Sequence, residues 1–183
     1  MKSFLEIGCA DFDTLIPFAR KGGWCGWCVE PMPHFASKLR VMAENLPVAI
    51  CEYAISDYEG EIQMVVGKGE EWATGASHVI SSNHAGGRLL DLPANKKLRG
   101  EEITVPCLSL DGFLDRFGIK DLDFCKIDIE GHEATMLRDY SWQVKPRMIK
   151  IEHCHSEGDV LDRILEARGY SLFVEQNDIY AVL

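Results

Sequence analysis

Short apolar segments alternate with amphipathic segments along the chain, and this alternation limits the folds open to it. The apolar segments have the length of strands, and the segments between them repeat their apolar residues at helical spacing. Such alternation is typical of a mostly parallel sheet with helices on both faces. The predicted strands are 4–7, 24–29, 48–54, 103–107, 123–128 and 148–153.

The predicted helices and the end of the chain complete this pattern. Helical spacing predicts helices at 33–45, 109–117 and 159–168, with Ser109 as an N-cap and Gly169 as a helix stop. The closing sequence YSLFVEQNDIYAVL has two apolar runs around its Asn-Asp pair, which predicts a β-hairpin. We therefore expect an α/β fold with a doubly wound, mostly parallel sheet and a C-terminal antiparallel hairpin.

Length and composition narrow the class of protein. A chain of 183 residues suits one domain spanning residues 1–183. The stretch 67–100 is rich in Gly, Ser and Asn, and we expect a mobile loop or lid there. The start MKSFLEIG lacks the apolar core of a secretory signal, so we expect a cytoplasmic protein whose seven cysteines are reduced. The net charge of −10 argues against binding nucleic acid, and no apolar stretch has the length of a membrane helix.

The segment FLEIGCADFDT is the first candidate for a ligand-binding loop. In open parallel sheets, ligands bind beyond the carboxyl ends of the strands. Gly8 would allow a tight turn there, Glu6 would anchor the loop, and Asp13 or Thr14 could cap the next helix. Glu30 follows Gly8 by 22 residues, close to the ~20 at which an acidic side chain binds a ribose. The alternative is that Gly8 only ends a strand and that Glu30 is a solvated carboxylate.

Several segments resemble the successive motifs of the FkbM family of S-adenosylmethionine-dependent methyltransferases. They are EIGCADFDT, VEPMPHF, AISDYEGEIQM, SLDGFLDRFGIKDLDFCKIDIEGHEATML and IKIEH, and they span nearly the whole chain. The most specific part is LDFCKIDIEGHEATML, a Lys-Ile-Asp-x-Glu-Gly-x-Glu run followed by an apolar helix. The resemblance implies a class I methyltransferase fold, which is Rossmann-like, with a seven-stranded sheet into which the final hairpin is inserted. It also implies S-adenosylmethionine as the cofactor.

The resemblance further implies which residues contact the cofactor. Glu30 matches the ribose-binding acid of the family, and Asp57 matches the acidic position after its third strand. Phe12 stands where the family usually has a second glycine. If position 12 requires a positive φ, Phe12 would weaken cofactor binding; if the backbone there is ordinary, Phe12 could pack over the cofactor. The residues assigned to the cofactor are Glu6, Gly8, Cys9, Ala10, Phe12, Glu30, Pro31 and Asp57.

An acidic cluster follows the predicted strand 123–128. Methyl transfer from a sulfonium is an in-line substitution, so the protein must align the acceptor and remove the proton of an acceptor hydroxyl. Asp128 is the first candidate for this base, with Glu130 second and His132 third. The alternative reading makes Glu130 and Glu133 carboxylates that are stabilised by the N-terminus of the next helix.

A divalent cation is a further possibility at the same edge of the sheet. KIEHCHSEGD ends the following strand with Glu152, His153 and His155. Together with Asp128, these residues could bind a cation that lowers the pKa of a hydroxyl, as in catechol-type methyltransferases. Histidines in such a place more often hydrogen-bond the loop or the substrate.

Two other patterns point to different functions. Asp128, Lys150 and Glu175 resemble three members of the Lys-Asp-Lys-Glu tetrad of ribose 2′-O-methyltransferases, but the first lysine has no counterpart. CGWC, residues 25–28, resembles a redox or zinc motif. Side chains three positions apart in a strand point to opposite faces, so we expect these cysteines to pack rather than to converge.

The sequence therefore predicts an S-adenosylmethionine-dependent O-methyltransferase that acts on a hydroxyl group of a small molecule or saccharide. The alternatives are a cofactor-binding regulatory protein without transfer activity and an RNA ribose 2′-O-methyltransferase. Because only three residues precede the first predicted strand, we also expect a second subunit to cover part of the sheet or pocket, giving a homodimer.

Overall fold

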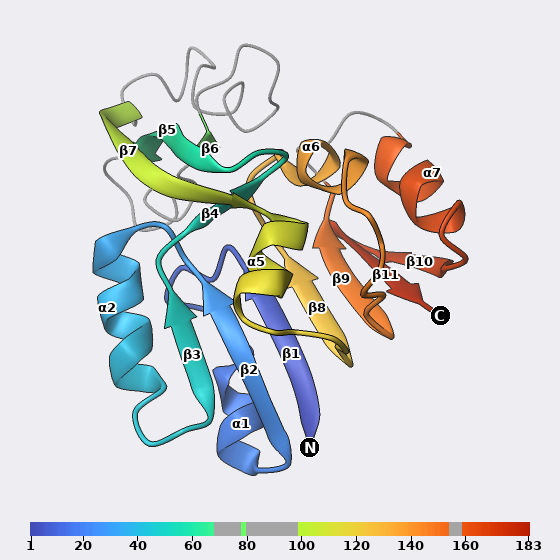
Figure 1. Ribbon diagram of the computed structural model, residues 1–183, viewed down its shortest axis with the longest axis horizontal. Coiled ribbons are helices and arrows are strands. Elements are labelled where there is room, and N and C mark those ends of the chain that lie inside the picture. The colour runs from blue at the N-terminus through green and yellow to red at the C-terminus, as the bar shows by residue number, and fades with distance from the viewer. Residues whose placement is uncertain (68–77, 80–98, 154–158) are drawn as a thin grey trace.

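The computed structural model describes residues 1–67, 78–79, 99–153 and 159–183, which form two sheets and five helices (Figure 1). The larger sheet has seven strands in the order β10-β11-β9-β8-β1-β2-β3. These strands are β1 (Lys2–Ile7), β2 (Trp24–Val29), β3 (Val48–Cys51), β8 (Phe124–Ile127), β9 (Met148–Glu152), β10 (Ser171–Glu175) and β11 (Asp178–Val182). Neighbours are parallel except where β11 pairs with β9 and β10. The predicted mostly parallel sheet and its C-terminal hairpin are confirmed.

Successive side chains of the central strand β1 enter opposite layers of the core, as the pleat of a strand requires. Leu5 and Ile7 pack in one apolar cluster, and Phe4 packs in another. All three are buried. Glu6 lies on the same face of the strand as Phe4. Its carboxylate therefore enters the core between its apolar sequence neighbours, Leu5 and Ile7.

The helices of the described residues are short. They are α1 (Ile16–Lys21), α2 (Pro33–Met42), α5 (Leu110–Arg116), α6 (Glu133–Arg138) and α7 (Val160–Glu166). Ser109 caps α5 as predicted, because its Oγ accepts a hydrogen bond from the Gly112 N–H at 3.0 Å. The predicted helix 33–45 is too long: Ala43 is the C-cap of α2, and Asn45 turns away with φ 61°.

The N-cap position of α1 is Leu15, so neither Asp13 nor Thr14 is the N-cap residue. Thr14 still contacts the start of the helix, because its Oγ1 accepts a hydrogen bond from the Ile16 N–H at 3.4 Å while its hydroxyl proton is donated to Glu6. Asp13 instead takes part in ion pairs with two lysines.

The second sheet is a feature that the sequence patterns did not reveal. Its strands are β4 (Ala54–Ser56), β5 (Gly60–Gly67), β6 (His78–Val79) and β7 (Arg99–Ser109), in the order β4-β7-β5-β6. The predicted strand 48–54 is therefore too long: its first part is β3, and the chain leaves the main sheet after Cys51. The predicted strand 103–107 is the middle of β7 and does not join the main sheet. Apolar side chains from this sheet instead pack with Met32 and Phe35 at the start of α2.

Most of the predicted lid at 67–100 lies outside the described residues. Of that stretch, the structure describes only its two ends, which belong to β5 and β7, and His78–Val79, which forms β6. The six cysteines that the structure describes are all free thiols. No helix within the described ranges is long and apolar enough to span a membrane.

The parallel strands of the main sheet end at one common edge, and the second sheet lies beyond that edge (Figure 1). The loops that follow β1, β2 and β8 meet there. This arrangement brings together residues that are far apart in the sequence.

Candidate active site

A cavity lies where the loops after β1, β2 and β8 meet. It encloses about 800 Å³ when its open mouth is included. Most of the predicted site residues line it: Gly8, Cys9, Ala10, Phe12, Glu30, Pro31, Asp128, Glu130 and His132. Four predicted residues are not in the lining: Glu6, Asp57, Glu152 and His153.

Gly8 forms the floor of the cavity and leaves no room for a side chain. Its φ is +78°, and an added Cβ would lie 1.7 Å from the carbonyl oxygen of Asp128. The Asp128 N–H also donates to the Ile7 carbonyl at 2.9 Å. The loops after β1 and β8 are therefore in direct backbone contact, which requires glycine at this position.

Glu30 links the loops after β1 and β2. Its side chain is buried, and its two oxygens accept hydrogen bonds from the Ala10 and Met32 N–H groups, each at 2.8 Å. Burial raises the pKa of Glu30 to about 7, although these backbone bonds lower it. The structure therefore excludes the reading of Glu30 as a solvated carboxylate.

The loop after β1 has two left-handed residues besides Gly8, and Phe12 is not one of them. Ala10 has φ 44° and Asp13 has φ 48°. Phe12 has ordinary backbone geometry, lines the cavity and is 57% exposed. A positive φ is therefore not the constraint at position 12.

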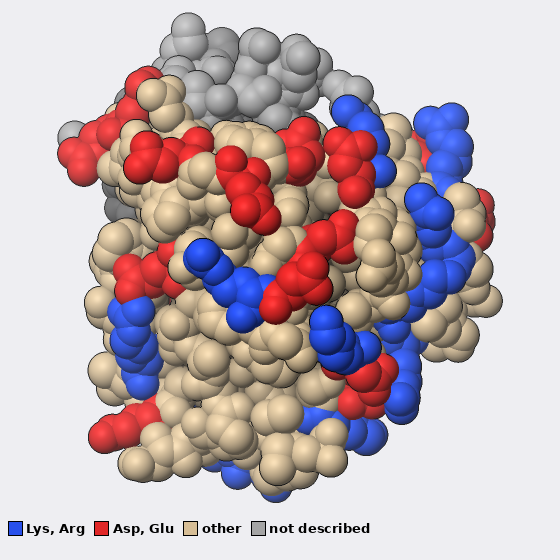
Figure 2. Space-filling view, in the orientation of Figure 1, with Lys and Arg blue, Asp and Glu red and all other residues tan. Residues whose placement is uncertain are grey.

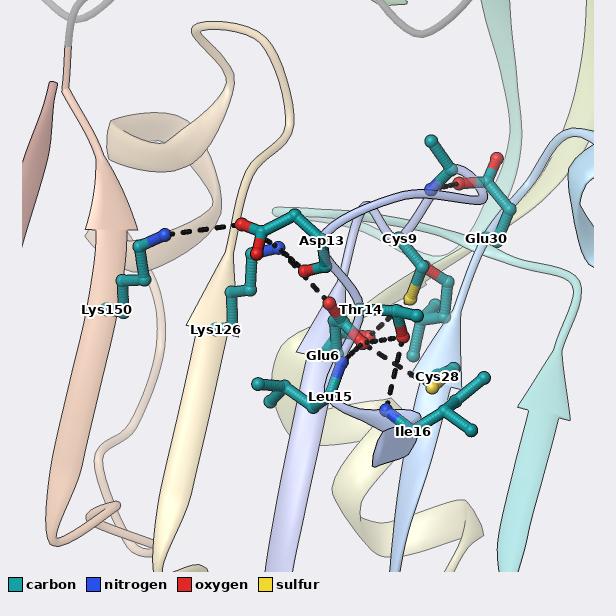
Figure 3. A network of polar contacts seen from close by, with 12 residues as sticks. Glu6, Cys9, Asp13, Thr14, Leu15, Ile16, Cys28, Glu30, Lys126 and Lys150 are labelled. Carbon is teal, nitrogen blue, oxygen red and sulfur yellow. Dashed lines mark hydrogen bonds and ion pairs between the residues drawn. The ribbon is translucent and has the colours of Figure 1, made fainter. Parts of the chain in front are cut away.

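Glu6 lies behind this loop, buried within the polar network of Figure 3. Its Oε2 accepts hydrogen bonds from the Thr14 hydroxyl at 2.7 Å and from the Leu15 N–H at 2.9 Å. Its Oε1 lies 3.3 Å from the Nζ of Lys126, a buried lysine of β8. Glu6 thus fixes the residues that lead into α1.

Asp128 and Glu130 lie in the same cavity but differ in proton affinity. Burial and the charge of Glu152 raise the pKa of Asp128 to about 6, with Lys126 acting in the opposite direction. Burial and the charges of Asp128, Glu152 and Glu133 raise the pKa of Glu130 to about 9. At neutral pH, Asp128 is mostly ionised and Glu130 is mostly protonated.

Glu133 binds backbone N–H groups of the loop that precedes α6. It is the first residue of α6, and its Oε1 accepts hydrogen bonds from the Ile129 N–H at 2.9 Å and the Gly131 N–H at 3.2 Å. These bonds hold the turn that carries Glu130, whose φ is 56°. Glu133 therefore shapes the loop, as the helix-terminus alternative expects.

Asp57 is connected to the cavity only through other side chains. The Ser56 hydroxyl donates to Asp57 Oδ1 at 2.9 Å and lies 2.7 Å from His132 Nε2. A hydroxyl has one proton, so Ser56 must accept its second bond from His132. His132 then carries a proton on Nε2.

A candidate cation site consists of three carboxylates. Oxygens of Asp128, Glu130 and Glu152 lie within 4.8 Å of one another. An all-oxygen set suits Mg²⁺ or Mn²⁺ better than Zn²⁺. His153 is not part of this group: its backbone N–H extends the β9 ladder by donating to Asn177. His155 lies outside the described residues.

The cavity also has walls formed by residues that the sequence analysis did not assign to the site. Apolar side chains come from the start of α2 and from the second sheet and its approach: Met32, Phe35, Tyr53, Ala54, Ile55 and Met64. Lys126 and Asp13 line it as well. The LDFCKIDIEG motif contains Lys126, and its place one residue before a buried strand end was the signal that could have identified it.

The geometry can be set beside known families. The family model described as the methyltransferase FkbM domain matches residues 6–172. The chain belongs to the FkbM methyltransferase family. A search among proteins of curated function finds no match. The FkbM match begins at Glu6 and includes every residue named for the cavity, so the resemblance of the sequence motifs is confirmed.

The contact between Gly8 and Asp128 predicts a large effect of Gly8→Ala on stability. Gly118→Ala is the matched control, because Gly118 also has a positive φ but has open space around it. The control should lose about 1–2 kcal/mol from backbone strain alone. Gly8→Ala should lose more than about 4 kcal/mol because it adds a clash with backbone. Urea unfolding measures both, and equal losses would contradict the close approach.

Proposed function

We propose that the protein is an S-adenosylmethionine-dependent O-methyltransferase with a class I fold that acts on a hydroxyl group of a small molecule or saccharide. The observation that carries the proposal is the single cavity in which Gly8, Glu30 and Asp128 meet. The FkbM match supports methyl transfer. The strand order of the main sheet, with its antiparallel β11, supports the class I assignment.

The residues present fit S-adenosylmethionine. Gly8 lets the backbone reach the cavity without a side chain, and Glu30 offers carboxylate oxygens to the two hydroxyls of a ribose. The apolar wall formed by Met32, Phe35 and Met64 suits a flat purine. When bound, the cofactor supplies a methyl group on a sulfonium and leaves as a thioether.

Asp128 is the proposed base. An ionised carboxylate with a pKa of about 6 can take the proton of an acceptor hydroxyl while the oxygen of that hydroxyl forms a bond to the methyl carbon. Protonated Glu130 can donate a hydrogen bond through its O–H and accept one at its other oxygen, but it cannot take the proton, so it would orient the acceptor. His132 remains the next candidate.

The charge distribution supports an acceptor without phosphate groups. On the face shown in Figure 2, acidic side chains spread over the upper half, above the ends of the main strands, and basic side chains lie mainly beside α7 and β9. The net charge is −10. Lys150 contacts Asp13 and Asp178, and β11 separates its strand from that of Glu175. These features favour a small acceptor over RNA.

Isothermal titration calorimetry with S-adenosylmethionine and S-adenosylhomocysteine tests the proposal. Binding of both, followed by transfer of a labelled methyl group to a member of a library of hydroxyl compounds and saccharides, is the expected result. Binding without transfer to any member would favour the regulatory alternative. Absence of binding would contradict both.

The burial of Glu30 predicts that cofactor affinity depends on pH. Hydrogen bonds from a ribose stabilise the ionised form, so binding should lower the pKa of Glu30 from about 7. Affinity for S-adenosylhomocysteine should therefore rise with pH up to about 7 and then level off, with a slope of at most about tenfold per pH unit. Calorimetry from pH 6 to 8 measures this slope. Glu30→Gln should bind more weakly and lose the slope; a slope that persists in Glu30→Gln would rule Glu30 out as its source.

The role of Asp128 predicts a separation of binding from turnover. Asp128→Asn keeps the size of the side chain but cannot take a proton, so methyl transfer should fall by about 10² to 10⁴-fold. Affinity for S-adenosylhomocysteine should change little. Glu130→Gln should have a smaller effect on turnover, because Glu130 is already neutral at pH 7. Equal losses in both variants would contradict the assignment of the base.

The proposed reaction uses no bound cation, although the three carboxylates could hold one. Activity should therefore persist after treatment with EDTA and dialysis, with the metal content checked by elemental analysis. Loss of activity that Mg²⁺ or Mn²⁺ restores would instead assign Asp128, Glu130 and Glu152 as metal ligands.

A further inference from the structure

The loop after β1 turns twice into the left-handed region without glycine. Gly8 is the only glycine between residues 4 and 21, yet Ala10 and Asp13 have positive φ. Left-handed backbone disfavours a residue with a Cβ by a factor of about 5 to 30, although Asp tolerates it better than most. Other contacts must therefore hold the loop in this shape.

A carboxylate stabilises the first of these turns. The Ala10 N–H donates to Glu30 Oε2 at 2.8 Å, so a buried carboxyl group accepts a hydrogen bond from the strained residue itself. The ionised form of Glu30 makes this hydrogen bond stronger than the protonated form does.

Lys126 contacts the second turn, at Asp13, as Glu30 contacts the first turn at Ala10 (Figure 3). Its Nζ donates to the backbone carbonyl of Asp13 and lies 3.2 Å from Asp13 Oδ2 and 3.3 Å from Glu6 Oε1. The two contacts with Asp13 are hydrogen bonds, and the contact with Glu6 is an ion pair. The side chains of Lys126 and Glu6 are 6% and 0% exposed, so solvent screens their ion pair weakly, whereas the Asp13 carboxylate is largely exposed.

A second lysine contacts the same carboxylate from the neighbouring strand. Lys150 Nζ lies 3.5 Å from Asp13 Oδ2 and 3.1 Å from Asp178 Oδ2. Burial raises the pKa of Asp13, but the charges of Lys126 and Lys150 outweigh this and lower it. Asp13 therefore remains ionised at neutral pH and can stay paired.

We propose that Lys126 is a positioning residue for the cofactor loop, holding Asp13 in the left-handed conformation by binding both its carbonyl and its carboxylate. This proposal rests on the proposed function, because the loop matters only if it lines a cofactor site. Phe12 and Asp13 both line the cavity. A release of the turn at Asp13 would therefore displace the cavity wall.

The alternative is that Lys126 only neutralises the buried carboxylate of Glu6. Substitutions of Asp13 separate the two roles, since they leave the Glu6–Lys126 pair in place. The Asp13 side chain is 72% exposed, so these variants should fold. Thermal unfolding of each variant checks this.

The test measures S-adenosylhomocysteine affinity by calorimetry for Asp13→Ala, Asp13→Asn and Asp13→Gly. Asp13→Ala loses the carboxylate and keeps the Cβ strain, so its affinity should fall by about 5- to 30-fold. Asp13→Gly supplies the left-handed conformation without strain and should bind within about threefold of the wild type. The affinity of Asp13→Asn should lie between those of Asp13→Ala and Asp13→Gly. Asp121→Ala, which removes one charge from an exposed ion pair with Arg147, is the matched control and should bind as the wild type does.

Each other outcome has a definite meaning. Wild-type affinity in Asp13→Ala would overturn the proposal. Equal losses in Asp13→Ala and Asp13→Gly would overturn it too, because the carboxylate would then act on the ligand rather than on the turn. Failure of the wild type to bind S-adenosylhomocysteine would instead contradict the proposed function.

Lys126 itself is tested by rescue. Lys126→Met should weaken binding, and adding Asp13→Gly should restore most of it if Lys126 acts through the turn. Since Lys126→Met leaves Glu6 buried without its cation, the same comparison is made with Glu6→Gln present. Absence of rescue in both backgrounds would assign Lys126 to charge neutralisation and overturn the proposal.

Discussion

The backbone contact between Gly8 and Asp128 is the constraint on which the rest of the site depends. Because no Cβ separates them, the loops after β1 and β8 close the floor of one cavity. Glu30 then joins this floor from β2 through its bond to Ala10. A side chain at position 8 would force the two loops apart and separate the predicted cofactor side from the predicted acceptor side.

Buried charges give the loop its shape where glycine is absent. Removing carboxylates and lysines from water is unfavourable, and it is offset only when every buried charge has several well-placed partners. Glu6 Oε2 accepts hydrogen bonds from a hydroxyl and a backbone N–H, and its Oε1, which has no hydrogen bond among the described residues, is held by the ion pair with Lys126. Such a network fixes one conformation of the loop, since any other would leave a charge buried without its partners.

Neighbouring carboxyl groups acquire different roles from their surroundings alone. Glu133 is held by backbone N–H groups and shapes a turn. Burial raises the pKa of both Asp128 and Glu130; Lys126 limits the rise for Asp128 to about 6, whereas neighbouring negative charges raise the pKa of Glu130 to about 9. Separation of pKa values within one site is a general way to obtain a base and a hydrogen-bond donor from the same chemical group. Here it favours Asp128 over Glu130 as the base.

Local sequence patterns determined much of this protein. Alternating strands and helices, the hairpin at the C-terminus and the cap at Ser109 follow from short-range spacing, and the motifs around Gly8, Glu30 and Asp128 located most of the cavity lining. Contacts between segments that are distant in the sequence were decided only by the tertiary structure. The break after Cys51, which sends the chain into a second sheet, depends on packing against α2. Lys126 reaches Asp13 across 113 positions, and Glu130 rather than His153 joins the carboxylate group. A pattern records which residues alternate along one segment, whereas charge pairing, desolvation and close backbone approach arise only when distant segments meet.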